Sequence, residues 1–472
     1  MSLSPDQISQ QLGTLLGSEA VITAREQMGA FLNEPRKRFH QSAVAVAQPR
    51  SVAQLQALAR WANENRVPLI PQGGNTGLVG GQVPLYGTEV IVSLTKLDKV
   101  RELDAQAGHM TLEAGVTLQA AHGAAEAAGA LFPLYIASQG SARIGGVLSS
   151  NAGGVQVLAY GNARELCLGV EAVLADGRLY QGLNSLRKNN TGYDLKDLLV
   201  GSEGTLGFIT AATLKLFPMP EGHETAICNV ADPEAALQLF YHVRQRAGQT
   251  LTAFEIVPQF GIEIELRHGT LDRDPTAAPS PWYVLVELSR PKGGAEGMLM
   301  EVIESAYESG LIDNAVLAES LDDRTRMWAM RENMSDTQSL EGASIKHDVS
   351  VPIAAVPQML AEGCARAETL VPGIRPCPFG HLGDGNIHFN FSQPLGWERE
   401  RFMALDEALH AEIYEIVQRL GGSVSAEHGI GQLKTGLLAA VKDPVALEMM
   451  RAIKTALDPK GIMNPGKMLA LK

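Results

Sequence analysis

Two short stretches in the second half of the chain, 380–388 (GHLGDGNIH) and 426–431 (AEHGIG), combine glycine turns with histidines, and the second adds a carboxylate. In the first stretch, a turn through 382–387 would let a strand ending at His381 pair with a strand starting at His388. Directly paired residues on neighbouring strands point to the same face, with Cβ atoms about 5 Å apart. This feature therefore predicts a hairpin that presents both imidazoles on one side.

The same residues predict a metal site. His381, His388 and Glu427 would supply three protein ligands and leave one position open, as in catalytic rather than structural divalent-metal centres. His428 is then left for proton transfer, and strand alternation places Asn390 on the same face as His388. The alternative is a pair of surface-loop histidines, and the pair alone does not decide between the two.

Size and composition restrict the remaining possibilities. A chain of 472 residues exceeds the roughly 250–300 residues of a single core, so two domains are expected. The 39 Lys and Arg against 52 Asp and Glu give a net charge of −13, which argues against nucleic acid and anionic membrane surfaces as partners. The four cysteines form no CxxC pair and indicate a reducing compartment.

The N-terminus resembles no signal peptide, and no apolar stretch of about 18 residues occurs. A cytoplasmic protein without a membrane span is expected, with a loosely attached membrane partner left open.

The order of helical and strand patterns predicts an α+β fold. Two prolines in 217–220 mark a domain boundary, beyond which strands and helices suggest an antiparallel sheet carrying helices. The expected elements are helices 4–38 (capped by Ser4), 51–65, 118–129, 233–247, 295–309 and 444–457, and strands 67–71, 89–94, 109–114, 252–257 and 282–288. The expected division is a cofactor domain 1–220 with an N-terminal helical segment 1–38, a substrate and metal domain 221–430, and a segment 431–472 that returns to the first domain.

Three glycine-rich segments precede the histidine stretches, at 71–81, 138–154 and 200–210. Glycines let backbone N–H groups converge on an anion, so the first segment is a candidate phosphate cradle. It has neither a GxGxxG nor a GK[ST] pattern, and a strand rather than a helix follows it. On its own, a segment of this kind is more often a mobile surface loop.

Together, in this order, the three segments resemble the FAD-binding domain of the vanillyl-alcohol oxidase/p-cresol methylhydroxylase flavoprotein superfamily. The closing 464–467 (NPGK) is similar to the C-terminal signature of that superfamily. The resemblance implies an FAD-binding domain of two α+β subdomains, and non-covalent FAD, because Asn75 and Thr76 stand where some relatives place a histidine. The implied FAD-binding residues are Gly73, Gly74, Asn75, Thr76, Gly77, Leu78, Ser138, Gly140, Ser141, Gly145, Gly146, Ser149, Asn151, Gly154, Gly204, Ile209 and Asn464.

A further group of residues could bind a carboxylate. In a helix through 328–342, Arg331 and Ser335 are i,i+4 neighbours. The segment 345–352 alternates like a strand, which places Lys346, Asp348 and Ser350 on one side of it. Arg, Ser and Lys together suit a carboxylate, with Arg making the bidentate contact. The alternative to a carboxylate site is that Arg331 is an exposed charge on a helix and Lys346 an exposed lysine on an edge strand.

This spacing resembles D-2-hydroxyglutarate dehydrogenases, in which an Arg, a hydroxyl residue four positions later and a Lys fifteen positions after the Arg bind the substrate carboxylate. Arg331, Ser335 and Lys346 match those positions, although the family more usually carries Thr where this chain has Ser335. By the same resemblance, Asn390 contacts the substrate and His428 is the base. The metal ligands implied are His381, His388 and Glu427.

The function expected from these residues and resemblances is an FAD- and metal-dependent dehydrogenase that oxidises D-2-hydroxyglutarate, or a related D-2-hydroxy acid, to the 2-oxo acid. A divalent metal, Zn²⁺ first, would act as a Lewis acid, with hydride passing to flavin and a proton to His428. The alternatives are a D-lactate or glycolate dehydrogenase of the same superfamily and a non-catalytic flavin-binding subunit. An electron-acceptor protein or a quinone is the expected partner, and a homodimer is left open.

Overall fold

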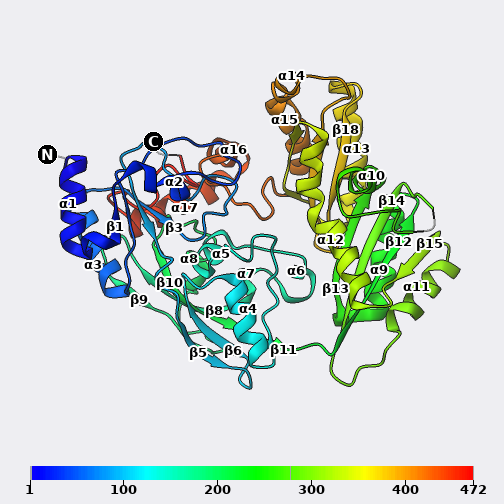
Figure 1. The fold of residues 1–472 in the computed structure, drawn as a ribbon, viewed down its shortest axis with the longest axis horizontal. Coiled ribbons are helices and arrows are strands. Elements are labelled where there is room, and N and C mark those ends of the chain that lie inside the picture. Colours follow the sequence, from blue (N-terminus) through cyan, green and yellow to red (C-terminus); the bar gives the residue numbers. More distant parts are fainter. Residues whose placement is uncertain (1–2, 277, 471–472) are drawn as a thin grey trace. The chain divides into compact units, whose positions relative to one another are not determined.

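The computed structural model describes residues 3–276 and 278–470, which form two compact units (Figure 1). The first unit contains the described residues up to Gly154, Gly161–Met219 and the segment from Glu427 onward. The second contains Val155–Tyr160 and Pro220–Ala426. Both units combine helices with largely antiparallel sheets, which confirms the expected α+β class.

The first sheet of the first unit is mixed, with the order β1-β2-β4-β3. Strands β2 and β3 run parallel to β4, whereas β1 is antiparallel to β2. Helices α1 and α3 bury their apolar faces against this sheet, and a serine caps the first turn of each. The bounds are α1 Pro5–Leu16, β1 Val21–Ile22, β2 Ala45–Ala47, α3 Val52–Asn65, β3 Leu69–Gln72 and β4 Val90–Ser93.

The expected helix over residues 4–38 is wrong beyond Leu16. Gly17 has a φ of 91°, a conformation that ends an α-helix and that glycine adopts without strain. The chain then pairs as β1 with β2 instead of continuing the helix. Three short helical pieces fill the remainder: η1 Ser18–Ala20, η2 Arg25–Gln27 and α2 Gly29–Leu32.

The second sheet of this unit is antiparallel, with the order β5-β6-β10-β8-β9. Strands β11 and β7 form a separate two-stranded sheet. The strands of the larger sheet are β5 Val100–Asp104, β6 His109–Glu113, β8 Cys167–Val173, β9 Leu179–Gln181 and β10 Phe208–Lys215, and those of the smaller are β7 Ala130–Leu131 and β11 Phe217–Pro218. The helices are α4 Leu118–Ala127, α5 Ile144–Ser150, α7 Ala163–Leu166, α8 Lys196–Leu199, α16 Thr435–Val441 and α17 Pro444–Leu457.

The second unit is built on one antiparallel sheet with the order β15-β12-β14-β13-β18-β19-β16, in which β17 also pairs with β19. Strands β13 and β18 are neighbours although β18 starts 117 positions after the end of β13. The strands are β12 Gly222–Val230, β13 Leu251–Pro258, β14 Trp282–Arg290, β15 Asn314–Leu317, β16 Ser344–Ile345, β17 Val349–Ser350, β18 Arg375–His381 and β19 Asn386–Ser392.

Helices cover both faces of this sheet. On one face α10 and α12 pack with Val257, Leu285 and Phe379 in a single apolar cluster. On the other face the ring of Phe254 meets α9, and α13 approaches β19 closely enough that a Cβ on Gly363 would lie 2.5 Å from Phe389. The helices are α6 Val157–Tyr160, α9 Pro233–Ala247, α10 Gln259–His268, α11 Met298–Glu308, α12 Leu321–Thr337, α13 Val356–Leu370, α14 Arg399–Met403 and α15 Asp406–Arg419, with η3 Gly248–Thr250, η4 Gln338–Glu341, η5 Ile353–Ala355 and η6 Leu382–Asp384.

Within the described residues, every helix is too short or too polar to cross a membrane.

Candidate active site

A cavity of the first unit is lined by all three glycine-rich segments. Its empty volume, which includes open solvent at its mouth, is about 960 Å³. Gly74 has to be glycine, because a Cβ there would lie 1.9 Å from the carbonyl oxygen of Ser141. Ten of the expected FAD-binding residues line it: Gly73, Gly74, Asn75, Thr76, Gly77, Gly145, Gly146, Ser149, Gly204 and Ile209.

The other expected FAD-binding residues are not part of this lining. Two of them support the cavity loops instead: the Asn464 amide donates to the carbonyl oxygens of Gly81 (2.9 Å) and Glu203 (2.7 Å), and Asn151 Oδ1 accepts from the Arg164 N–H (2.9 Å). The full set outside the lining is Leu78, Ser138, Gly140, Ser141, Asn151, Gly154 and Asn464.

The lining residues that the sequence reasoning missed include Arg143, Glu203 and Phe208. Arg143 is a cation within a glycine-rich segment and could have been found as a partner for a diphosphate. Glu203 accepts N–H groups from Ile430 (2.7 Å) and Gly431 (2.6 Å), and so holds the loop that follows His428. Burial raises the pKa of Glu203, although these two N–H groups act in the opposite direction.

His428 also lines this cavity, as the expected base should if it works beside a flavin. The glycine-rich walls and Arg143 fit a dinucleotide cofactor such as FAD.

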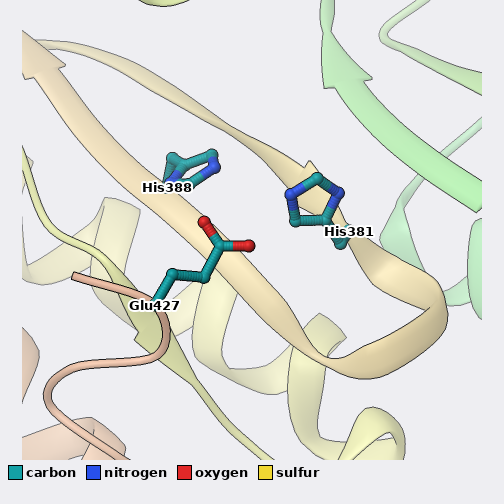
Figure 2. A group of neighbouring side chains, drawn as sticks. All are labelled: His381, His388 and Glu427. Atoms are coloured by element: carbon teal, nitrogen blue, oxygen red, sulfur yellow. The ribbon is translucent and has the colours of Figure 1, made fainter. Parts of the chain in front are cut away.

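The expected metal ligands come together (Figure 2). His381, His388 and Glu427 each offer a ligand atom, and these atoms all lie within 4.8 Å of one another. Glu427 follows Ala426 directly, and the Ala426 N–H donates to the carbonyl oxygen of Asp348 (3.3 Å). Two imidazoles and a carboxylate are ligands that suit Zn²⁺ at about 2.0–2.2 Å each. Ligand atoms on two such bonds at a tetrahedral angle lie about 3.4 Å apart, so side chains that are up to 4.8 Å apart must move closer together to bind one ion.

The hairpin register differs from the expected one. His381 pairs with Asn386, and His388 pairs with Phe379, so the two histidines are diagonal rather than direct neighbours. The turn is shorter than expected because Gly385 adopts a φ of 84° and lets the strands pair up to His381. The imidazoles still share a face, with ring centroids 5.7 Å apart.

The expected strand over 345–352 consists of two short pieces, β16 and β17, which keep one register along β19. Between them the imidazole of His347 contacts the carbonyl oxygen of Phe389 at 2.6 Å, which interrupts the ladder. The shared register places Lys346 opposite Asn390 and Asp348 opposite His388, so these side chains share the face of the histidines.

The expected carboxylate-binding residues also lie in the second unit. Arg331 and Ser335 are both in α12, and the Lys346 ammonium donates to the carbonyl oxygen (2.6 Å) and the hydroxyl (3.0 Å) of Ser335. Arg331 is 5% exposed, and its guanidinium carbon lies 4.9 Å from the centroid of the Phe379 ring. Within the described chain its Nη2 atom has no hydrogen-bond partner.

Asn390 is held by a residue that follows α12. Its amide nitrogen donates to Gln338 Oε1 (3.0 Å), and Gln338 Nε2 donates to the Ser392 hydroxyl (3.1 Å). The Asn390 Oδ1 atom is buried without a hydrogen-bond partner among the described residues. This oxygen can accept a hydrogen bond.

One buried carboxylate, Glu255 of β13, was missed and connects two site residues. Its Oε2 accepts from Arg331 Nε (2.7 Å), and its Oε1 contacts His381 Nδ1 (2.6 Å). Burial alone would raise the pKa of Glu255, but its interactions with His381 and Arg331 outweigh that effect and lower it to about 2. The available signal was an acid within an apolar strand, since acids are rarely buried unless paired.

Comparisons with known proteins agree with this architecture. The family described as FAD linked oxidases, C-terminal domain, matches residues 219–468, and the family described as FAD binding domain matches residues 43–182. The chain therefore belongs to the FAD-linked oxidase family. It is an FAD-dependent dehydrogenase, and the FAD expected from the glycine-rich segments is confirmed.

Curated relatives extend over most of the chain. A D-2-hydroxyglutarate dehydrogenase of Xanthomonas citri pv. viticola is 36% identical over 432 residues, which are 92% of this chain and 90% of that protein. The mitochondrial D-2-hydroxyglutarate dehydrogenase of Bos taurus is 37% identical over 431 residues, which cover 91% of this chain and 77% of that protein. The expected resemblance to this group of dehydrogenases is confirmed.

Solved structures confirm the fold expected from the superfamily. Substrate-bound p-cresol methylhydroxylase matches with a TM-score of 0.79 and 17% identity, covering 98% of this chain and 97% of the other. The 4-ethylphenol oxidase of Gulosibacter chungangensis, as an isoeugenol complex, matches with a TM-score of 0.74 and 18% identity, covering 99% and 98%.

Proposed function

We propose that this protein is an FAD- and metal-dependent dehydrogenase that oxidises a D-2-hydroxy acid to the 2-oxo acid, with D-2-hydroxyglutarate as the first candidate substrate. The similarity to D-2-hydroxyglutarate dehydrogenases over about nine-tenths of the chain supports this substrate. The observation that carries the proposal is Glu255, which hydrogen-bonds to both Arg331 and His381. A cation suited to a carboxylate is thereby held beside a candidate metal ligand.

Each site residue has a role in this reaction. Arg331, Lys346 and the Ser335 hydroxyl bind substrate carboxylate, and Asn390 offers an acceptor oxygen. Fixing C2 in a reactive orientation in this way can supply roughly 7–11 kcal/mol. His428 removes the hydroxyl proton. When bound, FAD takes the hydride from C2, and Zn²⁺ held by His381, His388 and Glu427 supplies Lewis acidity.

The remaining parts of the proposal concern organisation and partners. The segment 1–220 would hold FAD, non-covalently, and the segment 221–430 the substrate and metal. The protein would work in the cytoplasm, where its four cysteines stay reduced, and would pass electrons to an acceptor protein or a quinone.

A panel of D- and L-2-hydroxy acids, assayed with a dye acceptor, tests the substrate class. We expect the D-2-hydroxy dicarboxylic acid to give the highest kcat/KM. A higher kcat/KM for D-lactate or glycolate would assign the protein to the monocarboxylate dehydrogenases. Absence of turnover with every member of the panel would contradict the enzymatic proposal.

Replacing Lys346 tests whether a second carboxylate is bound. Truncating one member of a buried, hydrogen-bonded charge pair costs about 2–5 kcal/mol. At about 1.36 kcal/mol per tenfold, Lys346→Ala should lower kcat/KM for D-2-hydroxyglutarate by roughly 30- to 5,000-fold. Lys346→Met should lower kcat/KM by a similar factor, because it keeps the apolar stem of the side chain and removes only the charge. Steady-state kinetics with both variants measures the effect.

D-lactate distinguishes the two positions that Lys346 could serve. If Lys346 holds the distal carboxylate, D-lactate turnover should change much less than D-2-hydroxyglutarate turnover. Equal losses would move Lys346 to the carboxylate next to C2 and remove the main argument for a dicarboxylate. No loss with either substrate would remove Lys346 from the site.

The flavin should be released from the protein by acid denaturation. Among the described residues that line the glycine-rich cavity, His428 is the one histidine and cysteine is absent, while Asn75 and Thr76 offer no tether. We therefore expect the yellow colour to appear in the supernatant after acid precipitation. Flavin in the pellet would contradict non-covalent binding, and its release from a His428→Ala variant would then identify His428 as the tether.

A further inference from the structure

Glu255 is an acid in a strand whose residues are all buried, Leu251–Pro258. It lies outside every motif of the sequence, and its side chain is 1% exposed. The pairing of Ile256 with Gly380 between β13 and β18 places Glu255 opposite His381. The helix α12 covers the same face of the sheet and brings Arg331 within reach. The fold therefore places one carboxylate between a candidate metal ligand and a candidate substrate ligand.

The geometry of these contacts fixes both partners. Glu255 Oε1 lies 2.6 Å from His381 Nδ1. An ionised carboxylate can only accept, so Nδ1 is the donor of this hydrogen bond and Nε2 is the nitrogen that can bind a metal. Metal-binding histidines commonly donate their second nitrogen to a carboxylate, which orients the ring and raises its basicity. Glu255 Oε2 accepts a hydrogen bond from Arg331 Nε at 2.7 Å. The buried Nη2 atom has no partner among the described residues, so it is the guanidinium nitrogen that can donate to a ligand.

We propose that Glu255 is a positioning residue that prepares His381 for the metal and Arg331 for the substrate carboxylate, and thereby couples the binding of the two. The inference rests on the proposed metal site. It adds a residue that acts through others and touches neither metal nor substrate. The prepared arrangement requires a carboxylate, because a glutamine at this position could accept from one partner but would turn its NH₂ group toward the other donor.

Metal affinity of the purified protein tests the proposal without any assay of turnover. The metal is removed, and Zn²⁺ binding is measured by competition with a chromophoric chelator, with the absorption spectrum of the Co²⁺ form as a second readout. Loss of a partner of this kind commonly weakens metal binding 10- to 100-fold. We expect that loss in Glu255→Gln, together with an altered Co²⁺ spectrum. Glu255→Asp retains the charge on a shorter stem and should fall between Glu255→Gln and the wild type.

The neighbouring strand β14 offers a matched control. Glu287 is also 1% exposed and is bound by the same helix, through Arg324 (2.7 and 2.8 Å) and Trp328 Nε1 (2.7 Å). It contacts none of the candidate metal or substrate ligands in the described hydrogen bonds. We expect Glu287→Gln to lower the melting temperature as Glu255→Gln does but to bind Zn²⁺ like the wild type.

Coupling gives a second readout. In the wild type, 2-oxoglutarate should tighten Zn²⁺ binding, and in Glu255→Gln this effect should shrink.

Zn²⁺ binding in Glu255→Gln equal to that of the wild type would overturn the proposal while leaving the metal site intact. Equal weakening in Glu287→Gln would assign the effect to general destabilisation and also overturn it. If the wild type itself binds no Zn²⁺, the proposed metal-dependent function fails first. If Glu255→Gln does not fold, the Zn²⁺ affinity of Glu255→Asp is compared with that of the wild type. Weaker binding in Glu255→Asp would support the proposal, and equal binding would overturn it.

Discussion

Removal of the metal should abolish turnover while FAD stays bound. Among the described residues, His381, His388 and Glu427 are not part of the lining of the glycine-rich cavity, so a chelator should empty the metal site without removing FAD. A Lewis-acid metal contributes several kcal/mol, here about 4–6. At about 1.36 kcal/mol per tenfold, the expected loss is roughly 10³- to 10⁴-fold. Dye reduction before and after dialysis against chelator measures it.

Added Zn²⁺, Co²⁺ or Mn²⁺ should restore activity to the chelated protein. His388→Ala should reproduce the loss and resist restoration. His268→Ala removes an imidazole from α10, where it pairs with Glu341 at 2.9 Å, and should leave both metal content and activity unchanged. Full activity in a preparation that elemental analysis finds free of metal would contradict the proposed role.

Local rules predicted those parts of the fold and site that depend on neighbours in sequence. The helix α9 begins at Pro233 after the Asp232 cap and ends before Gly248, which is where the sequence places it. Arg331 and Ser335 share a helix because their i,i+4 spacing lies within one continuous helical pattern. Two of the three candidate metal ligands, His381 and His388, lie on a hairpin that is local in sequence. The glycine-rich segments depend on the close backbone approach seen at Gly74.

The hairpin also shows the limit of local rules. Its face assignment was right because side chains alternate along a strand, but its register was wrong by two residues. Each added pair satisfies further backbone N–H and C=O groups, so the strands close on the shortest turn that the chain allows. Gly385 allows a turn from Leu382 to Gly385, and its N–H donates to the carbonyl oxygen of His381 (3.0 Å).

Glu255 and Glu203 could not be placed from the sequence, for a different physical reason. Glu255 reaches His381 through the pairing of β13 with β18, 126 positions apart, and Glu203 reaches Ile430 across 227 positions. Such pairings are set by the whole sheet or by loop packing rather than by local pattern. A buried acid signals only that a partner exists, and the sequence does not say which residue it is.

His428→Ala should keep FAD and metal but lose the reductive half-reaction. His428 lines the glycine-rich cavity and directly follows Glu427, one of the candidate metal ligands. A side chain in that position can take the hydroxyl proton as hydride leaves C2. General-base catalysis of this kind contributes typically about 10²- to 10⁴-fold. Anaerobic mixing of the protein with D-2-hydroxyglutarate, followed by flavin absorbance, measures the reductive step separately from reoxidation.

The dependence of that step on pH distinguishes a base from a residue that only shapes the cavity. In the wild type, the rate should level off once His428 is deprotonated. In His428→Ala, the substrate must lose its proton to solvent, so the rate should keep rising with pH, by about tenfold per unit at most. Glu427→Gln provides the contrast, because it should lose metal along with activity. A loss below tenfold in His428→Ala, with a pH profile like that of the wild type, would show that another group takes the proton.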